Sequence, residues 1–224
     1  TTVDGEKTIM HPGDFVITPA WTWHDHGNDT GEPMVWLDGL DIPMVLFLST
    51  MFAEVYPDGV PPITKPVGDS LARYGAGLLP YGHEAMTLNS PVINYPYERT
   101  REALEKMRGA AEWDPCHGLK MRYVNPVNGE SAMPTMSTFM QLLPKGFETQ
   151  PYRSTDGAIY CVVEGHGTTQ VGTQTLAWGP RDVFVLPSWS RHSHTALADA
   201  VLFSFSDRVA QEKLGLWRER RGNE

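Results

Sequence analysis

Two pairs of histidines carry the most chemistry in this 224-residue sequence. His24 and His26 lie two residues apart, and so do His192 and His194. Residues two apart in a β-strand point to the same face, so each pair would present two imidazoles together. Converging imidazoles are suited to binding a metal ion or relaying a proton. A lone His-x-His is a weak signal, and its commoner explanation is a hydrogen-bonded structural histidine.

Both pairs close the same local pattern, in which an Asp and a β-rich run of four residues precede Pro-x-Trp-x-x-His-x-His. The copies occupy residues 13–26 and 181–194, an offset of 168 residues. This offset is far longer than one unit of a solenoid, so it predicts two similar domains in one chain. We expect short strands at 15–17 and 183–186, each ended by a proline, with the histidines on the following strand.

The repeated pattern resembles the second sequence motif of the cupins. In the first copy the matching residues are Gly13, Asp14, Pro19, His24 and Asn28. A segment resembling the first cupin motif follows Gly146, but Tyr152 and Ser154 stand where that motif has His-x-His, and Ala158 stands where it has Glu. Hydroxyl groups do not replace imidazoles as ligands of a divalent transition metal at neutral pH. The resemblance therefore implies a second barrel without metal, in which His192 and His194 are structural.

The first copy lies close to the start of the sequence. Residues 1–8 predict a β-hairpin with Asp4-Gly5 as its turn, and only a few residues separate this hairpin from Gly13. The strands that would carry the first motif of this barrel are not in the sequence. We therefore expect a fragment of a longer protein, whose upstream part completes a three-histidine site.

Further segments sharpen the resemblance. They are Asp-Gly-Leu-Asp-Ile-Pro at 38–43, Tyr-Val-Asn-Pro at 123–126, Leu-Pro-Lys-Gly-Phe-Glu-Thr at 143–149 and Leu-Phe-Ser-Phe-Ser-Asp at 202–207. In this order they resemble gentisate 1,2-dioxygenases and their salicylate and hydroxynaphthoate relatives over nearly the whole chain. The resemblance implies a mainly all-β bicupin of two double-stranded β-helix (jelly-roll) barrels. It also implies that upstream residues supply two iron ligands and the arginines that hold the substrate carboxylate.

For the site, the resemblance implies extradiol-type cleavage of gentisate by O2 to maleylpyruvate, with Fe(II) held by three neutral imidazoles. His24 matches the one iron ligand within this chain. We expect His26 to exchange a proton or a hydrogen bond near the iron, and Asp38 to accept a hydrogen bond from a ring hydroxyl. Trp36 would form an apolar wall for the substrate. The alternative for Asp38 is that it caps a turn before Gly39.

Two alternatives remain open. One is an enzyme of the same group that acts on salicylate or 1-hydroxy-2-naphthoate. The other, of a different class, is a non-enzymatic cupin that binds a small molecule. An intact His-x-His upstream would favour an enzyme, and the upstream residues that line the site would decide the substrate.

Composition narrows the remaining functions. The formal net charge of −9 argues against a nucleic-acid partner, because phosphate binding needs a basic face. No apolar run is long enough to span a bilayer, so no membrane partner is expected. Cys116 and Cys161 are expected to be buried free thiols in a cytoplasmic protein. The residue types include no nucleophile elbow and no phosphate-binding glycine loop.

The expected domain order has four parts. Residues 1–43 would form the C-terminal half of a first barrel, 44–130 an inter-barrel segment, 131–207 a second barrel and 208–224 a helical tail. Within the inter-barrel segment we predict a helix beginning in 43–55, a loop at 56–67 and a helix at 97–113. This segment offers contact surface for a homotetramer. Four further histidines are expected to be exposed or merely hydrogen-bonded: His11, His83, His117 and His166.

Overall fold

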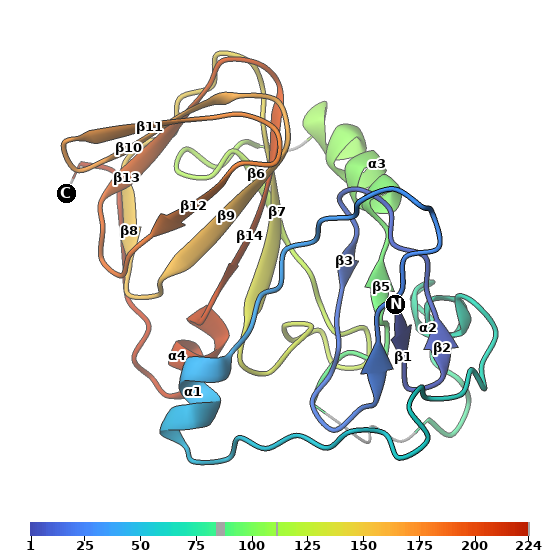
Figure 1. The fold of residues 1–224 in the computed structure, drawn as a ribbon. Coiled ribbons are helices and arrows are strands. Elements are labelled where there is room, and N and C mark those ends of the chain that lie inside the picture. Colours follow the sequence, from blue (N-terminus) through green and yellow to red (C-terminus); the bar gives the residue numbers. More distant parts are fainter. Residues whose placement is uncertain (84–87, 111, 224) are drawn as a thin grey trace. The chain divides into compact units, whose positions relative to one another are not determined.

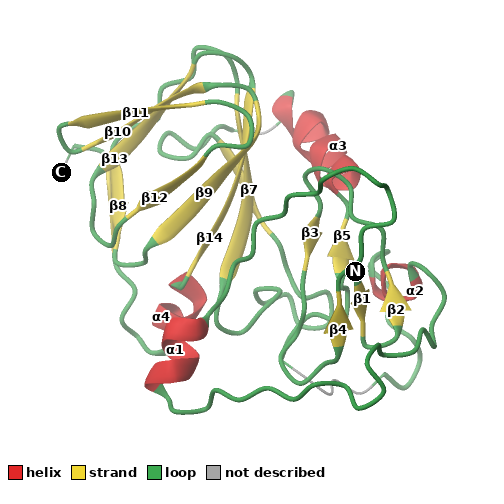
Figure 2. Ribbon diagram, viewed as in Figure 1, coloured by secondary structure: helices red, strands yellow, loops and turns green. Residues whose placement is uncertain are grey.

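The computed structural model describes residues 1–83, 88–110 and 112–223, which are mostly β-strands with a few short helices (Figures 1 and 2). The chain divides into two compact units. The first comprises residues 1–98 and 125–130, and the second comprises 99–124 and 131–224. The predicted all-β class is confirmed. None of the helices formed by the described residues is long and apolar enough to cross a membrane.

The first unit begins with the predicted hairpin. Strands β1 (Thr2–Val3) and β2 (Glu6–Lys7) are joined by Asp4 and Gly5, whose φ angles are 46° and 80°. Positive φ at both central residues is what a tight type I′ turn requires, and Asp-Gly favours it. Strand β4 (His24–Asp25) adds to the other edge of β1, giving the order β2-β1-β4.

Three more pairings and helices complete this unit. Strand β3 (Phe15–Val16) pairs with β5 (Asn94–Tyr95), and the helices are α1 (Ile42–Phe47) and α2 (Asp69–Tyr74). The rings of Phe15 and Tyr95 stack with centroids 5.5 Å apart. This pairing ties the turn before β4 to a strand some 80 residues later, so the position of the first histidine pair depends on the inter-barrel segment.

The second unit is a barrel of two five-stranded antiparallel sheets. One sheet has the order β11-β10-β13-β8-β15 and the other β12-β9-β14-β7-β6. The strands are β6 (Leu119–Arg122), β7 (Ser137–Leu143), β8 (Tyr152–Ser154), β9 (Ala158–Glu164), β10 (Gly167–Val171), β11 (Gln174–Trp178), β12 (Val183–Leu186), β13 (His192–Ala196), β14 (Ala200–Ser206) and β15 (Glu219–Arg221). Helices α3 (Tyr97–Arg108) and α4 (Arg208–Lys213) flank them in sequence.

The core of the second barrel lies between its two sheets. Its buried members include Leu143, Tyr160, Trp178 and Leu202. Alternation along β14 explains the arrangement, because residues two apart in a strand share a face and bury their side chains together. Burial of large apolar and aromatic side chains is the main force that holds the two sheets together.

The repeat predicted from the sequence extends to the first residue. In the first unit Val3 pairs with His24 and Thr2 with Lys7. In the second unit Val171 pairs with His192 and Gln170 with Thr175, so each position lies 168 residues after its counterpart. The two histidine pairs therefore stand on the same local framework of three antiparallel strands.

Some expected elements differ from the structure. Helix α3 ends at Arg108, before Gly109, whereas the prediction extended it to 113; Ala111 lies outside the described residues. The strand expected around Asp38 is wrong, because residues 33–41 form no strand pairing in the described structure. Two strands lie where none was expected. β6, within the predicted inter-barrel segment, pairs with β7, and β15, within the predicted tail, pairs with β8. Cys116 is buried, Cys161 is partly buried, and both are free, as predicted for thiols.

Candidate functional site

The first histidine pair lies at the end of the three-stranded sheet of the first unit. Trp21 adopts a left-handed backbone with φ of 66°, which turns the chain so that His24 enters β4 opposite Val3. The His24 imidazole is exposed, and its ring centroid is 5.5 Å from that of His26, with the rings edge to face. As expected from their spacing, the two imidazoles lie together.

The His26 ring is fixed on two sides. Its Nδ1 is hydrogen-bonded to Oγ1 of Thr1 at 2.8 Å, and its face stacks on Trp36, with centroids 5.5 Å apart. Burial lowers the pKa of His26, and the nearby His24 and the terminal amine lower it further, whereas Asp38 opposes the shift. The neutral imidazole is therefore favoured, which is the form that binds a metal or accepts a proton.

The structure brings the four predicted site residues into one region. His24, His26 and Trp36 are linked through ring contacts, and the charge of Asp38 acts on His26. No described residue donates a hydrogen bond to the Asp38 carboxylate, so the explanation that it caps a turn lacks the bond it needs. The sequence analysis missed Thr1, although Thr169 lies at the same 168-residue offset and would have indicated it.

The donor set of this region is incomplete for a metal. Among the described residues, no group of three or more His, Cys, Asp or Glu side chains is placed to hold an ion. Asn28, which matches the end of the cupin motif, uses its amide to bind the carbonyl of Glu32 and its oxygen to accept from Thr30. It fixes a turn. The fit to iron is thus partial, since the described residues offer two neutral-type imidazoles and leave the other positions to be filled.

In the second unit the inner histidine of the pair is structural. His194 is buried, and its Nδ1 is hydrogen-bonded to Oγ1 of Thr169 at 2.8 Å, as His26 is to Thr1. The same hydroxyl accepts a hydrogen bond from the indole N–H of Trp178 at 2.9 Å. Burial holds the pKa of His194 well below its ordinary value. This histidine is a neutral hydrogen-bonding group of the core.

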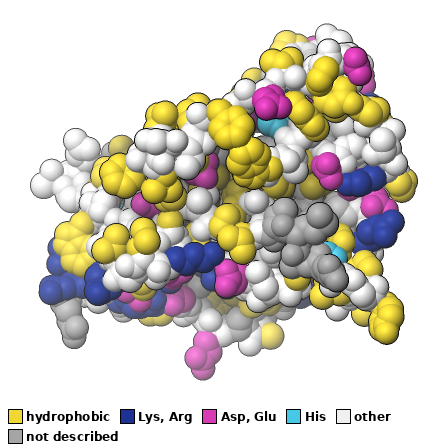
Figure 3. Space-filling model, turned by 90° about the horizontal axis from the view of Figure 1, so that it is seen from below, with side chains coloured by type: hydrophobic (Ala, Val, Ile, Leu, Met, Phe, Trp, Pro, Cys, Tyr) yellow, Lys and Arg dark blue, Asp and Glu magenta, His cyan; other side chains and the backbone are white. Residues whose placement is uncertain are grey.

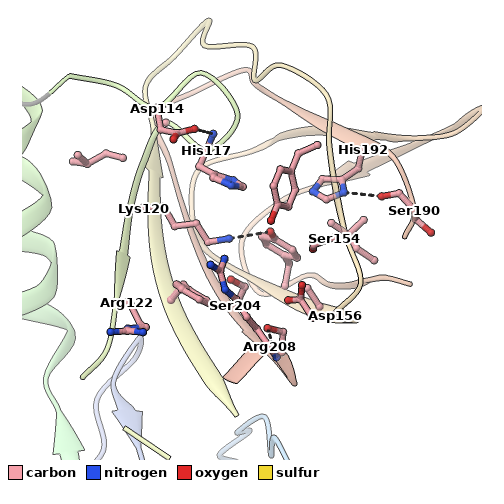
Figure 4. Close-up of a pocket in the computed structure, with 18 of the residues that line it drawn as sticks. Asp114, His117, Lys120, Arg122, Ser154, Asp156, Ser190, His192, Ser204 and Arg208 are labelled. Atoms are coloured by element: carbon pink, nitrogen blue, oxygen red, sulfur yellow. Dashed lines mark hydrogen bonds between the residues drawn. The ribbon is translucent and has the colours of Figure 1, made fainter. Parts of the chain in front are cut away.

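His192 lies on the wall of a cavity in the second barrel (Figure 4). Its Nδ1 lies 3.1 Å from the carbonyl of Ser190, which only accepts, so Nδ1 carries the proton and Nε2 is left as an acceptor. Burial lowers the pKa of His192 to about 4. The neighbouring Tyr152 donates its phenolic hydrogen to Glu219 at 2.9 Å. Tyr152, which stands at the position of a cupin ligand, is thereby committed to a hydrogen bond.

His117 was expected in a loop and at the surface or hydrogen-bonded. It does follow a turn, in which Asp114 accepts hydrogen bonds from the backbone N–H groups of Cys116 and His117 at 2.8 and 3.0 Å. Its ring, however, packs 4.4 Å from that of Tyr152 and lines the same cavity as His192. Burial, with help from Lys120 and Arg221, lowers its pKa to about 2. No local sequence pattern indicated this placement, because it depends on the closure of the barrel.

Comparison with known proteins places these features in a family. Residues 1–41, which carry the first histidine pair, match the Cupin domain family. The chain is 60% identical over 221 residues, 99% of its length, to a gentisate 1,2 dioxygenase 1 of Aquipseudomonas alcaligenes. The chain is homologous to the gentisate 1,2-dioxygenases. A 5-aminosalicylate 1,2-dioxygenase of Comamonas sp is 38% identical over 98% of the chain.

Solved structures agree with this homology. A salicylate 1,2-dioxygenase from Pseudaminobacter salicylatoxidans superposes with a TM-score of 0.91 at 32% identity over 99% of this chain. The same type of enzyme, in a structure of its adducts with gentisate, gives a TM-score of 0.87 at 33% identity over 95% of the chain. The chain covers 65% and 60% of these two structures, and 64% and 59% of the two curated relatives. It therefore spans less than two thirds of the length of each, and its fold is that of a bicupin dioxygenase.

Proposed function

We propose that this chain forms part of a gentisate 1,2-dioxygenase that opens the aromatic ring of gentisate by an extradiol-type reaction. The observation that carries the proposal is 60% identity across 99% of the chain to a gentisate dioxygenase. The neutral imidazole pair of the first unit supports it, since such a pair suits a non-haem iron centre. In this reaction both atoms of O2 enter the product, maleylpyruvate.

The proposed cofactor is Fe(II), with His24 as a ligand. His24 is the exposed member of the pair, at the position of the cupin motif's ligand, and its ring is open to further groups. Since the described residues supply no complete set, the remaining ligands would come from histidines outside them. Bound Fe(II) would hold substrate and O2 in contact and let electron density pass between them.

Three neighbours of His24 have proposed roles in handling the substrate. His26, held by Thr1 and Trp36, would exchange a hydrogen bond or a proton with the substrate or oxygen. Asp38, exposed and without a printed partner among the described residues, would accept a hydrogen bond from a ring hydroxyl. Trp36 would give the aromatic ring an apolar wall.

A second candidate substrate is salicylate, because the superposed structures are salicylate dioxygenases. 1-Hydroxy-2-naphthoate is a further possibility, since a 1-hydroxy-2-naphthoate 1,2-dioxygenase is 33% identical to the chain. A purely non-enzymatic small-molecule binder is disfavoured by this set of relatives. We further propose a cytoplasmic homotetramer, with residues 1–43 in the first barrel, 44–130 between the barrels, 131–207 in the second barrel and 208–224 as a tail.

The substrate is tested by steady-state ring cleavage with the iron-loaded protein. Gentisate, salicylate and 1-hydroxy-2-naphthoate are compared at equal concentration by oxygen uptake and by the absorbance of the opened product. We expect the highest kcat/KM with gentisate. A higher kcat/KM with salicylate would assign the protein to the salicylate dioxygenases, and no cleavage of any of the three would refute the proposed activity.

A further inference from the structure

The second barrel contains a cavity that the proposed reaction does not use. Its volume is about 380 Å³, within the range of small-molecule sites. All of its lining residues belong to the second unit, and they come from β6, β8, β9, β14, α4 and neighbouring loops (Figure 4). The question is what the polar groups in its wall would recognise.

Lys120 brings a positive charge into this cavity. Its ammonium lies 3.4 Å from the Tyr160 hydroxyl and 4.8 Å from the centroid of the Phe139 ring. Within the described part of the chain no carboxylate lies within ion-pair distance of Lys120. A partly desolvated ammonium without a counterion is costly, and a bound anion would offset that cost.

Ser204 adds a hydroxyl without a partner beside this charge. The residue is 2% exposed, and its Oγ forms no hydrogen bond in the described structure. In the sheet it lies opposite Phe139 on one side and Tyr160 on the other. Directly opposed residues of antiparallel strands point to the same face, so Ser204 lies between the two rings over which the Lys120 ammonium is placed.

The acids in the wall are already engaged. Asp114 pairs with Arg221, and Asp156 accepts a hydrogen bond from the indole of Trp217 at 2.9 Å. Burial raises the pKa of Asp156, but hydrogen bonds from Ser154, Ser206 and Trp217 outweigh it and hold the carboxyl below its ordinary pKa. This carboxylate stays charged and would repel a dianion. One unpaired ammonium facing one fixed carboxylate suits a monoanion.

The rest of the wall is aromatic and neutral. Phe139, Tyr160 and Tyr152 line it, together with the imidazoles of His117 and His192. Because Nδ1 of His192 donates to Ser190, its Nε2 is an acceptor for a hydroxyl or amine donor. We propose that this cavity binds a small aromatic monocarboxylate, whose carboxylate contacts Lys120 and Ser204 and whose ring lies among the aromatic side chains.

The test is calorimetric binding of benzoate to the full chain, with uncharged benzyl alcohol as the comparison ligand. We expect benzoate to bind and benzyl alcohol to bind at least tenfold more weakly. Lys120→Gln should weaken benzoate binding about tenfold or more, and Ser204→Ala severalfold, because each removes a direct contact. Lys145→Gln, at an exposed lysine outside the cavity, should bind benzoate like the parent chain.

Two controls separate this site from the first unit and from misfolding. His24→Ala should leave the benzoate affinity unchanged, whether or not the protein cleaves rings. Thermal unfolding of each variant shows that the barrel is intact, and the small Ser204→Ala change serves if Lys120→Gln does not fold. Equal benzoate affinity in the parent and folded Lys120→Gln, tighter binding of inorganic phosphate than of benzoate, or loss of binding in His24→Ala would each overturn the proposal.

Discussion

The two histidine pairs share a backbone framework but differ in what surrounds the imidazoles. His26 stacks on an exposed Trp36 and feels the charge of Asp38, whereas His192 faces a phenol that is committed to Glu219. Residue type and spacing predicted the pairs and their common face. The surroundings depend on residues far apart in the sequence, and for that reason His117 and Lys120 could not be assigned to a cavity in advance.

The first prediction concerns His26 and Asp38. His26→Ala and Asp38→Asn should retain iron but lower the turnover of gentisate by roughly 10- to 100-fold, because they position or polarise groups without binding the metal. Iron content and kcat are measured on the same preparations. His11→Ala, at an exposed histidine of the same unit, is the matched control. Full turnover in both variants would show that neither residue has the proposed role.

The second prediction is a pH dependence of the stability of the second unit. The pKa of His192 is about 4 in the folded chain, below the usual 6.5, so the unfolded chain binds more protons between these pH values. Stability should therefore fall as the pH is lowered from about 6.5 towards 4, with His192 contributing roughly 2 kcal/mol. Urea unfolding at pH 7 and pH 4.5 measures the loss. An equal loss in His192→Gln and in the parent would contradict this contribution.

At the scale of elements, the turns before each histidine strand are also repeated. Gly13 and Arg181 have φ of 89° and 75°, and Trp21 and Trp189 have 66° and 61°. Left-handed backbone is strained for residues with a Cβ, so the repeat preserves an unfavourable conformation at three of these four positions. The shared turn geometry fixes how each histidine enters its strand.

The third prediction uses the difference between Gly13 and Arg181. Arg181→Gly should raise the free energy of unfolding by up to about 1 kcal/mol, because glycine adopts positive φ without strain. Gly13→Ala should lower it by roughly 2 to 4 kcal/mol, since a Cβ there would lie 2.7 Å from the Tyr97 ring. Thermal or urea unfolding tests both, with Arg181→Ala as the control that keeps the strain. A loss of stability in Arg181→Gly would show that strain relief is not the dominant effect.

Short-range signals explain which elements were predicted well. The hairpin at residues 1–8 has an Asp-Gly turn, and the strand at 183–186 has a β-branched, apolar run. β15 was missed because its sequence, Glu-Arg-Arg, has no apolar alternation and depends on pairing with β8. The strand expected around Asp38 failed for the opposite reason, since an apolar sequence found no partner strand.

At the scale of the whole molecule, apolar side chains remain at the surface. Those of the inter-barrel segment include Phe47 and Val55, each 87% exposed, and Phe52. Apolar groups are also visible among charged ones on the face in Figure 3. Large exposed apolar side chains in one segment are typical of an interface between protein subunits. They support the proposed homo-oligomer.

The fourth prediction follows from these side chains. Phe47→Asp combined with Val55→Asp should shift the protein from a tetramer to smaller species, because a buried charge disfavours association. Light scattering coupled to size-exclusion chromatography measures the mass. Leu197→Asp, at an exposed leucine of the second unit, should leave the mass unchanged. A monomeric parent protein would contradict the proposed assembly.

The most direct measurement compares iron content and gentisate-dependent oxygen uptake in His24→Ala and His192→Ala. The central claim is that the first histidine pair binds the catalytic iron and that its structural counterpart in the second barrel does not. We predict that the iron-loaded parent and His192→Ala consume one O2 per gentisate, as a dioxygenase must. His24→Ala should retain no iron and consume no oxygen. Normal iron and turnover in His24→Ala, or loss of iron in a folded His192→Ala, would contradict the account.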